Sequence, residues 1–557
     1  MRFFYKKSKK NRQNIAILRR FFNLGIETAL CVCYNVKDNL SKFEMLNRIL
    51  EIKMEKIAII DLGSNSARLV LVNILEGGYF VVFDELKESV RLGQDLDSDG
   101  FLKPQRVAQT IKTLTMFRRL CDANHIDKIY AYATAAVRRA KNQKSFLDEV
   151  AVTCGIKIKV LSVEEQAMLV YQGVINSMDV PRGLIMEMGG GSTNLIYYNR
   201  RNLINYESLP FGAVTLTDLF KNDSDKPEER NQKIEDFFRE QLEKIPWLKT
   251  IEPDTQLVGV GGSFRNLGRI SRMIKKYPFN MTHGYEVPIS EFEQIYKTMK
   301  CLDLDSTMKI KGLSSGRADI FPSALAAINA VVKHVEFNKI IISGCGLREG
   351  AMFRYAVPGI AEKPLSDVLG HSLHTLMTYF DINQTHAEHV YNLSIQLFKQ
   401  LKVLHKLPRM YVRVLKIASL LHDSGMRIKY YHHQKHSAYI ILNSNLYGVP
   451  HKDIILASFV AGGHRKVEFN REELIKYKDL LNVEDLDAIK KLSVILRIAE
   501  SFDRSMSSVI TGISCDVLGD SVIVKTETEG DCSLEIKDAL TAAADFKDAY
   551  GKTLEIL

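Results

Sequence analysis

The sequence predicts an α/β protein of two related halves, followed by a helical region and a small α+β domain. The main observation is an apolar run, an acidic residue and a Gly/Ser turn that occur twice, at 57–66 and 184–193. Strand-like and helix-like segments alternate from Met54 to Pro358, which is typical of α/β folds. Eleven of the fourteen histidines lie in the helical stretch that follows. The domains expected from these patterns are 54–180, 181–358, 366–510 and 511–557.

The bulk composition argues against a nucleic-acid-binding protein. The chain has 557 residues, enough for three or four domains, and a formal net charge of +10. Residues 1–53 account for +8 of that charge, so the remainder carries only +2. Because Met54 directly precedes the first apolar run, we expect residues 1–53 to be a flexible basic extension or the product of a wrongly chosen start codon.

The apolar stretch in this extension, 21–34, is too short to cross a bilayer. The eight cysteines form neither a disulfide framework nor a zinc pattern. We therefore expect a cytoplasmic protein with no membrane partner and no nucleic-acid partner.

The first half contains the segments expected of alternating strands and helices. Proline near the first turn and an apolar stripe predict a helix over 104–125. Strands are predicted at 128–133 and 156–161, and a helix at 163–176.

The second half and the C-terminal region continue this pattern. A polar helix is predicted around 226–246, and the last strand of the half at 339–343. In the C-terminal domain, 521–525 alternates like a strand, and a helix is predicted near 539–550.

Each repeated turn has the composition of a phosphate-binding loop. A strand that ends in a carboxylate and continues into small residues exposes backbone N–H groups that hold phosphate, and the carboxylate can hold a metal. Two such loops facing each other would clamp a phosphate chain, whereas one alone reads more simply as a tight turn. With the Gly-rich loop after 258, the candidate phosphate-binding residues are Gly63, Ser64, Asn65, Ser66, Gly190, Gly191, Ser192, Thr193, Gly261, Gly262 and Ser263.

An ordered set of motifs resembles the exopolyphosphatase / guanosine pentaphosphate phosphohydrolase family, which has the actin-like (ribonuclease H-like) fold. The matching segments are 60–66 with Arg68, 89–93, 133–138 with Asn142, 162–173, 189–193, 209–214, 259–263 and 317–319. The resemblance implies two actin-like lobes, an all-helical domain related to HD phosphohydrolases, and a homodimer. It also implies release of orthophosphate from inorganic polyphosphate, with guanosine pentaphosphate as an alternative substrate.

The resemblance also implies roles for individual residues. Arg91 and Arg138 fall on motif positions and would clamp phosphate, with Arg68 and Arg265 as weaker candidates. Asp61 and Glu187 are the candidate ligands of Mg²⁺ or another divalent cation. In the second loop the family usually has Asp in place of Glu187, and Glu in place of Asn194.

The general base implied by the resemblance is Glu165, which aligns with the first acid of the family's Glu-Glu-Ala signature. Glu165→Gln should then lower the rate by ~10²–10⁴. The alternative is structural, because Ser162 followed by Glu165 is also a capping box at a helix start.

The helical region carries a histidine and aspartate pattern similar to that of HD proteins. The candidate metal ligands are His386, His422, Asp423 and Asp503, and His432, His436 and His464 belong to the same pattern. The alternative is a helical domain without a metal centre, which packs beside the cleft and binds polymer.

Two other functions remain open from the sequence. The loss of an acid at Asn194 fits a sensor that binds polyphosphate or an alarmone without hydrolysing it. An actin-like ATPase or kinase would use the same lobes. Phosphate release from polyphosphate, compared with binding alone and with ATP consumption, distinguishes the three functions.

Overall fold

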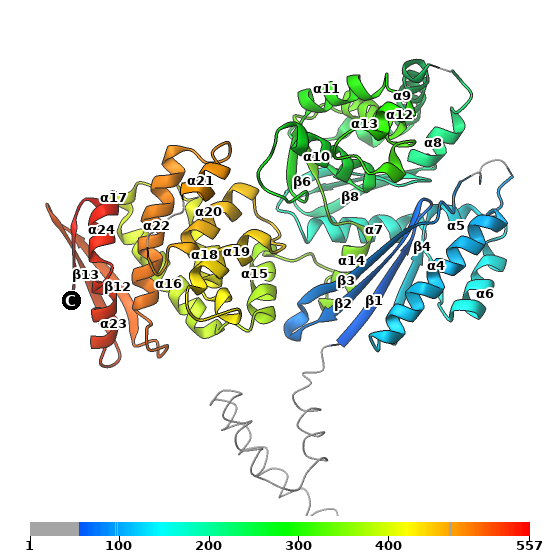
Figure 1. Cartoon of the computed structure of the whole chain (residues 1–557). Helices are drawn as coiled ribbons and strands as arrows, with labels where there is room; N and C mark the ends of the chain where they lie inside the picture. Colours follow the sequence, from blue (N-terminus) through cyan, green and yellow to red (C-terminus); the bar gives the residue numbers. More distant parts are fainter. Residues whose placement is uncertain (1–54, 95, 97–98, 225, 467–470) are drawn as a thin grey trace, which may run out of the picture. The chain divides into compact units, whose positions relative to one another are not determined.

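Two α/β lobes form the first part of the computed structural model, which describes residues 55–557 except 95, 97–98, 225 and 467–470 (Figure 1). The prediction for residues 1–53 lies outside the described residues. The elements of lobe I are β1 (Glu55–Leu62), β2 (Ser66–Ile74), β3 (Phe80–Ser89), α4 (Pro104–Ala123), β4 (Lys128–Ala133), α5 (Ala135–Arg139), α6 (Gln143–Cys154), β5 (Ile158–Val160) and α7 (Val163–Ile175). Their strands are ordered β3-β2-β1-β4-β5.

Lobe II repeats this topology and adds one edge strand. Its elements are β6 (Arg182–Met188), β7 (Thr193–Asn199), β8 (Asn202–Leu209), α8 (Ala213–Leu219), α9 (Pro227–Glu243), β9 (Gln256–Val260), α10 (Gly262–Ile274), β10 (Tyr285–Pro288), α11 (Ile289–Met299), α12 (Leu304–Met308), α13 (Phe321–His334), β11 (Lys339–Ile342) and α14 (Leu347–Ala356). The strand order β8-β7-β6-β9-β11 matches that of lobe I, and β10 pairs antiparallel with β11. The two halves are therefore related in structure, as the repeated loop predicts.

Alternate residues of β1 face two different layers of helices. Ala58 and Ile60 belong to a core that includes residues of α4 and α6. Ile57 and Ile59 belong to another, together with residues of α7 and α14 and of the lobe II strands. A period of two is the geometry of a strand that is buried on both faces. Helices α7 and α14 thus share one core with both sheets.

Helices α7 and α14 pack closely against each other because glycine residues lie at their contact. A Cβ atom on Gly350 would lie 1.8 Å from the carbonyl oxygen of Leu169, and one on Gly173 would lie 2.1 Å from that of Gly346. Any larger residue would force the two backbones apart. This crossing connects the end of lobe II to lobe I.

The helical domain and the C-terminal strands share one hydrophobic core. The helices are α15 (Val368–Tyr379), α16 (Gln384–Gln400), α17 (Lys402–His405), α18 (Tyr411–Leu421), α19 (His433–Asn443), α20 (His451–Gly462), α21 (Arg471–Lys476) and α22 (Val483–Ser501). The C-terminal elements are β12 (Ile510–Val517), β13 (Ser521–Thr528), α23 (Ser533–Leu540), α24 (Ala543–Tyr550) and β14 (Thr553–Ile556). The predicted fold class, two actin-like lobes followed by a helical domain and a small α+β part, is confirmed.

One predicted helix is wrong in detail. The segment near 539–550 is divided between α23 and α24, because the chain turns at Thr541. The hydroxyl of Thr541 donates to the carbonyl oxygen of Asp538 at 2.6 Å and so competes with continuation of the helix. In the described part of the chain, no helix is both long enough and apolar enough to pass through a membrane.

Candidate functional site

A pocket of about 110 Å³ lies where the strand ends of the two lobes meet. Asp61 near the end of β1 and Glu187 near the end of β6 both line it, with the loops that follow these strands. The predicted residues in the lining are Asp61, Gly63, Ser64, Asn65, Ser66, Glu187, Gly190, Gly191, Ser192, Gly261 and Gly262. The structure thus brings together the three Gly-rich loops that the sequence singles out.

The two repeated loops have the same internal hydrogen bond and face each other. The N–H of Gly63 donates to the carbonyl oxygen of Ser66 at 3.1 Å, and that of Gly189 donates to Ser192 at 3.0 Å. A Cβ atom on Gly191 would lie 2.7 Å from the Oγ of Ser64. A side chain at this position would have to displace the Ser64 hydroxyl, so the close approach of the opposite loop favours glycine.

A chain of hydrogen bonds fixes the orientation of Glu187. The Arg138 guanidinium donates to the Oε1 of Gln166 at 3.2 Å, so the Gln166 amide must direct its Nε2 away from Arg138. That Nε2 donates to the Oε2 of Glu187 at 3.0 Å. Asn194, the cross-strand partner of Glu187 on β7, donates to the same oxygen through Nδ2. Arg138 is not itself part of the lining and acts through Gln166.

The two pocket carboxylates have raised pKa values. Burial, and to a lesser extent the charge of Asp61, raises the pKa of Glu187 to about 7, against the opposing hydrogen bonds from Asn194 and Gln166. Burial also raises the pKa of Asp61, although the nearby Arg348 and Arg68 oppose this. The Glu187 carboxylate is therefore set to exchange a proton near neutral pH.

Four arginines surround the pocket: Arg68, Arg265, Arg317 and Arg348. Burial and the charges of Arg68 and Arg348 lower the pKa of Arg265 to about 9. Burial, followed by the charge of Arg68, lowers the pKa of Arg317 to about 10. Among the described residues, the side chain of Arg265 has no carboxylate within ion-pair distance. A bound anion would offset this crowding of positive charge.

Sequence reasoning found only part of this cluster. Arg68 and Arg265 are weaker candidates from the sequence, and Arg317 and Arg348 have no role assigned from it. Arg348 is held by Glu85 at 2.9 Å. Arginines are common on protein surfaces, so the sequence alone does not show which of them line a pocket. Only the folded structure shows which guanidinium groups lie together around it.

Glu165 does not line the pocket. Its Oε2 accepts a hydrogen bond from the backbone N–H of Ser162 at 3.0 Å, and its N–H donates to the Ser162 Oγ at 3.1 Å, which completes the capping box of α7. Its other oxygen pairs with Lys159 at 2.5 Å, and this contact lowers the pKa of Glu165. Glu165 therefore completes the helix cap and lies outside the lining, whereas the next residue, Gln166, lines the pocket.

Three other predicted residues also lie outside the lining. Arg91 pairs with Asp319 of lobe II at 2.8 Å, so it connects the lobes. The Thr193 hydroxyl donates to the carbonyl oxygen of Phe211 at 2.7 Å. Ser263 is fully buried, with its Oγ 3.5 Å from the Arg317 guanidinium.

In the helical domain the four predicted ligands do meet. The imidazole of His386 lies 2.7 Å from Asp503 and 3.7 Å from Asp423, and His422 lies 3.5 Å from Asp423. His433, which the sequence pattern does not single out as a ligand, also contacts Asp423, at 3.2 Å.

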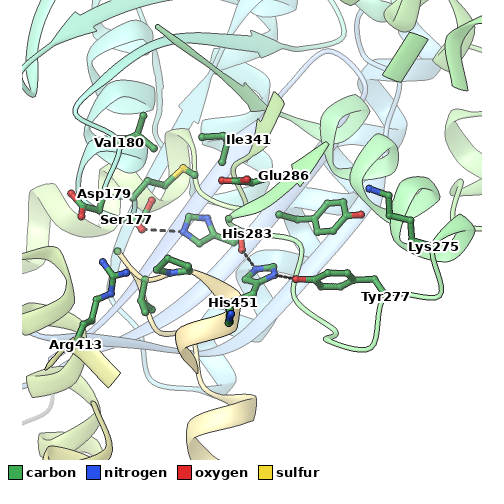
Figure 2. Close-up of a pocket in the computed structure, with 17 residues that line it drawn as sticks. Ser177, Asp179, Val180, Lys275, Tyr277, His283, Glu286, Ile341, Arg413 and His451 are labelled. Atoms are coloured by element: carbon green, nitrogen blue, oxygen red, sulfur yellow. Dashed lines mark hydrogen bonds between the residues drawn. The ribbon is translucent and has the colours of Figure 1, made fainter. Parts of the chain in front are cut away.

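A larger pocket, of about 440 Å³, lies between lobe II and the helical domain (Figure 2). Figure 2 shows three hydrogen bonds here, between the His283 ring and the backbone carbonyl oxygen of Ser177, between the His451 ring and that of His283, and between the His451 ring and the Tyr277 hydroxyl. His451 Nε2 lies 2.8 Å from the carbonyl oxygen of His283. Burial lowers the pKa of His451 to about 4, so the ring is neutral at pH 7.

Comparisons with known proteins agree with this architecture. Residues 70–357 match the Ppx/GppA phosphatase family, and residues 369–541 match Ppx/GppA phosphatase, domain III. The structure of an exopolyphosphatase from Cytophaga hutchinsonii is 24% identical with a TM-score of 0.50, and the match covers 56% of this chain and 99% of that one. A Ppx/GppA family member from Aquifex aeolicus is 26% identical with a TM-score of 0.47, over 54% of this chain and 97% of that one.

Proposed function

Because the chain belongs to the Ppx/GppA phosphatase family, we propose that it hydrolyses the terminal phosphoanhydride bond of inorganic polyphosphate and releases orthophosphate. The observation that carries this proposal is the group of four arginines beside two facing Gly/Ser loops. Guanidinium groups and backbone N–H groups both bind phosphate oxygens. Burial, followed by the charges of neighbouring arginines, lowers the pKa values of Arg265 and Arg317, and a bound anion would compensate both effects.

The size of the pocket limits what enters it. At about 110 Å³ it is far smaller than the ~300–1,000 Å³ typical of small-molecule sites, so it takes terminal phosphate and no nucleoside. Positive charge continues to Lys87, the cross-strand partner of Arg68. Burial, followed by the charge of Arg68, lowers the Lys87 pKa to about 8. A chain of phosphates matches this line of positive charge. Guanosine pentaphosphate, which also ends in a phosphoanhydride, is the second candidate substrate.

We assign the general base to Glu187. It is a pocket carboxylate whose pKa lies near 7, where a base combines a large deprotonated fraction with good proton affinity. Gln166 and Asn194 hold one of its oxygens, which leaves the other to accept a proton from water. The arginines then stabilise the charge that develops on the transferred phosphoryl group.

We assign the magnesium ion to Asp61. Magnesium takes one or two carboxylates together with substrate phosphates, and when bound it neutralises phosphate charge. Asp61 fits this role because it is a carboxylate that lines the pocket beside the first phosphate loop. Glu187 fits less well, since amide N–H groups from Gln166 and Asn194 already occupy its Oε2.

The test is phosphate release from long-chain polyphosphate and from guanosine pentaphosphate, with magnesium and with a chelator. Magnesium-dependent release from polyphosphate that is lost in Glu187→Gln supports the proposal. Binding of polyphosphate without release would identify a sensor instead. ATP hydrolysis with no release from polyphosphate would identify an ATPase.

A further inference from the structure

The interior of the helical domain gathers four histidines around one aspartate. His386 lies in the first turn of α16, His422 and Asp423 follow α18, His433 begins α19, and His464 follows α20. The four histidines are between 0% and 4% exposed. The Asp423 side chain is 10% exposed. Buried ionisable groups in this number need partners that compensate their loss of water.

Three of these rings are oriented in the same way by the backbone. His422, His433 and His464 each place Nδ1 at 2.6–2.8 Å from the carbonyl oxygen three residues earlier. Because a carbonyl oxygen only accepts hydrogen bonds, each Nδ1 carries the proton. Each Nε2 therefore presents a lone pair toward the centre of the cluster. Metal-binding histidines are typically held in this way through their second nitrogen.

His386 is oriented by a carboxylate instead. Its Nδ1 lies 2.7 Å from the Oδ2 of Asp503, so Nδ1 donates and Nε2 is directed toward Asp423. The other Asp503 oxygen accepts the N–H of Ser508 at 2.8 Å. Asp503 thus holds the ring of His386 in this orientation.

The free nitrogens converge on Asp423 and on one another. His433 Nε2 lies 3.2 Å from one Asp423 oxygen, and His422 Nε2 lies 3.5 Å from the other. The Nε2 atoms of His433 and His464 are only 3.0 Å apart. Within the part of the chain that the structure describes, His422 Nε2 has no hydrogen-bond partner. Lone pairs that face each other repel unless a cation lies between them.

We propose that the helical domain binds two divalent transition-metal ions that share Asp423. One ion is held by His386, His422 and Asp423, and the other by Asp423, His433 and His464. In each set the donor atoms all lie within 4.8 Å of one another. Imidazole with carboxylate suits manganese, iron, nickel or zinc. Three protein ligands leave each ion a position for water, as in hydrolytic two-metal sites.

This centre is independent of the phosphate pocket. Its ligands all lie between 386 and 464, whereas the phosphate pocket is lined by residues 61–349. Imidazole-rich ligands also select different ions from the oxygen ligands of the phosphate pocket. The two proposals can therefore fail separately.

The experiment measures metal content on the full chain. Protein is stripped with a chelator, reloaded with manganese alone, desalted and analysed by elemental mass spectrometry. We expect two equivalents in wild type and in Asp61→Asn, almost none in Asp423→Asn, and one in His464→Gln. The exposed neighbour His432 serves as the control, and His432→Asn should keep two equivalents.

Paramagnetic resonance of the reloaded wild type provides a second measurement that does not depend on variants. Two manganese ions joined by one carboxylate couple magnetically, so the hyperfine pattern of isolated manganese should be lost. One equivalent or none in the wild type overturns the proposal. So does an uncoupled manganese signal, or full retention of metal by a folded Asp423→Asn protein.

Discussion

Arg265 offers the most direct test of the anion site, because its buried positive charge should lower the stability of the ligand-free protein. Burial and two neighbouring arginines lower its pKa from 12.5 to about 9. That difference corresponds to about 5 kcal/mol by which the folded environment disfavours the charged form. Solvent in the pocket and the loss of side-chain packing reduce the net effect. We expect Arg265→Met to stabilise ligand-free lobe II by roughly 1–3 kcal/mol.

The single tryptophan of the chain makes this measurable within one lobe. Trp247 packs against the lobe II core, so its fluorescence follows the unfolding of that lobe. In buffer free of phosphate and sulfate, the variant should unfold at a temperature higher by about 2–8 °C. Added tripolyphosphate should raise the midpoint of the wild type, because it binds the folded state. The same addition should have little effect on Arg265→Met.

Arg239→Met is the control. Arg239 lies on α9 of the same lobe, is exposed and does not line the pocket. Its midpoint and its response to tripolyphosphate should match those of the wild type. A lower midpoint for Arg265→Met combined with an unchanged response to tripolyphosphate would refute the assignment of Arg265 to anion binding.

The other substitutions test the base, the domain junction and the helix crossing. Glu187→Gln should lower kcat by ~10²–10⁴, whereas Glu165→Gln should lower stability by ~1 kcal/mol and leave kcat within about threefold, because Glu165 caps a helix. The reverse ranking of the two variants would restore Glu165 as the base. Burial lowers the folded pKa of His451 to about 4, so the unfolded chain takes up this proton first. The junction with His283 should therefore lose about 3 kcal/mol between pH 6.5 and pH 4, and hydrogen-exchange protection factors there that do not fall over this range would contradict this. Gly173→Ala should destabilise the α7–α14 crossing by ~1–3 kcal/mol or more, measured as the unfolding midpoint, and wild-type stability would show that the crossing relaxes freely.

The pocket loops could be predicted because their signal is local. A strand, an acid and small residues at fixed spacing define a turn whose N–H groups point outward, and the repeat of that pattern predicts a matching turn opposite. The contact of Gly191 with Ser64 then follows from the topology of two similar lobes. Arg348 could not be found in this way. It reaches the pocket from the start of α14, and only tertiary packing places that helix end beside β1.

The neighbours Glu165 and Gln166 show why single positions on a helix are hard to assign from sequence. Consecutive side chains on α7 point about 100° apart. One residue can therefore cap the helix while the next one faces the pocket. The capping box uses Glu165, and the next side chain, Gln166, meets Glu187. The sequence contains both the capping residue and the pocket residue. They can be told apart only when the first residue of α7 is known from the structure.

The two unusual residues of the second loop form one unit in the structure. Glu187 and Asn194 are cross-strand partners on β6 and β7, and the Asn194 amide donates to the Glu187 carboxylate. Restoring an acid with Asn194→Glu would replace that donor by a second carboxylate directly opposite the first. Like charges this close raise the pKa of one another.

Asn194→Glu should therefore lower activity at pH 7 and move the rise of kcat/KM from about pH 7 to a higher pH, since the raised pKa of Glu187 would rise further. Asn194→Gln keeps an amide donor and should retain the profile of the wild type. Adding Glu187→Gln to Asn194→Glu removes the repulsion and leaves the introduced acid as the only carboxylate of the pair. If Asn194→Glu instead accelerates phosphate release at pH 7, then Glu187 is a metal ligand that lacks its second acid, and the base must lie elsewhere.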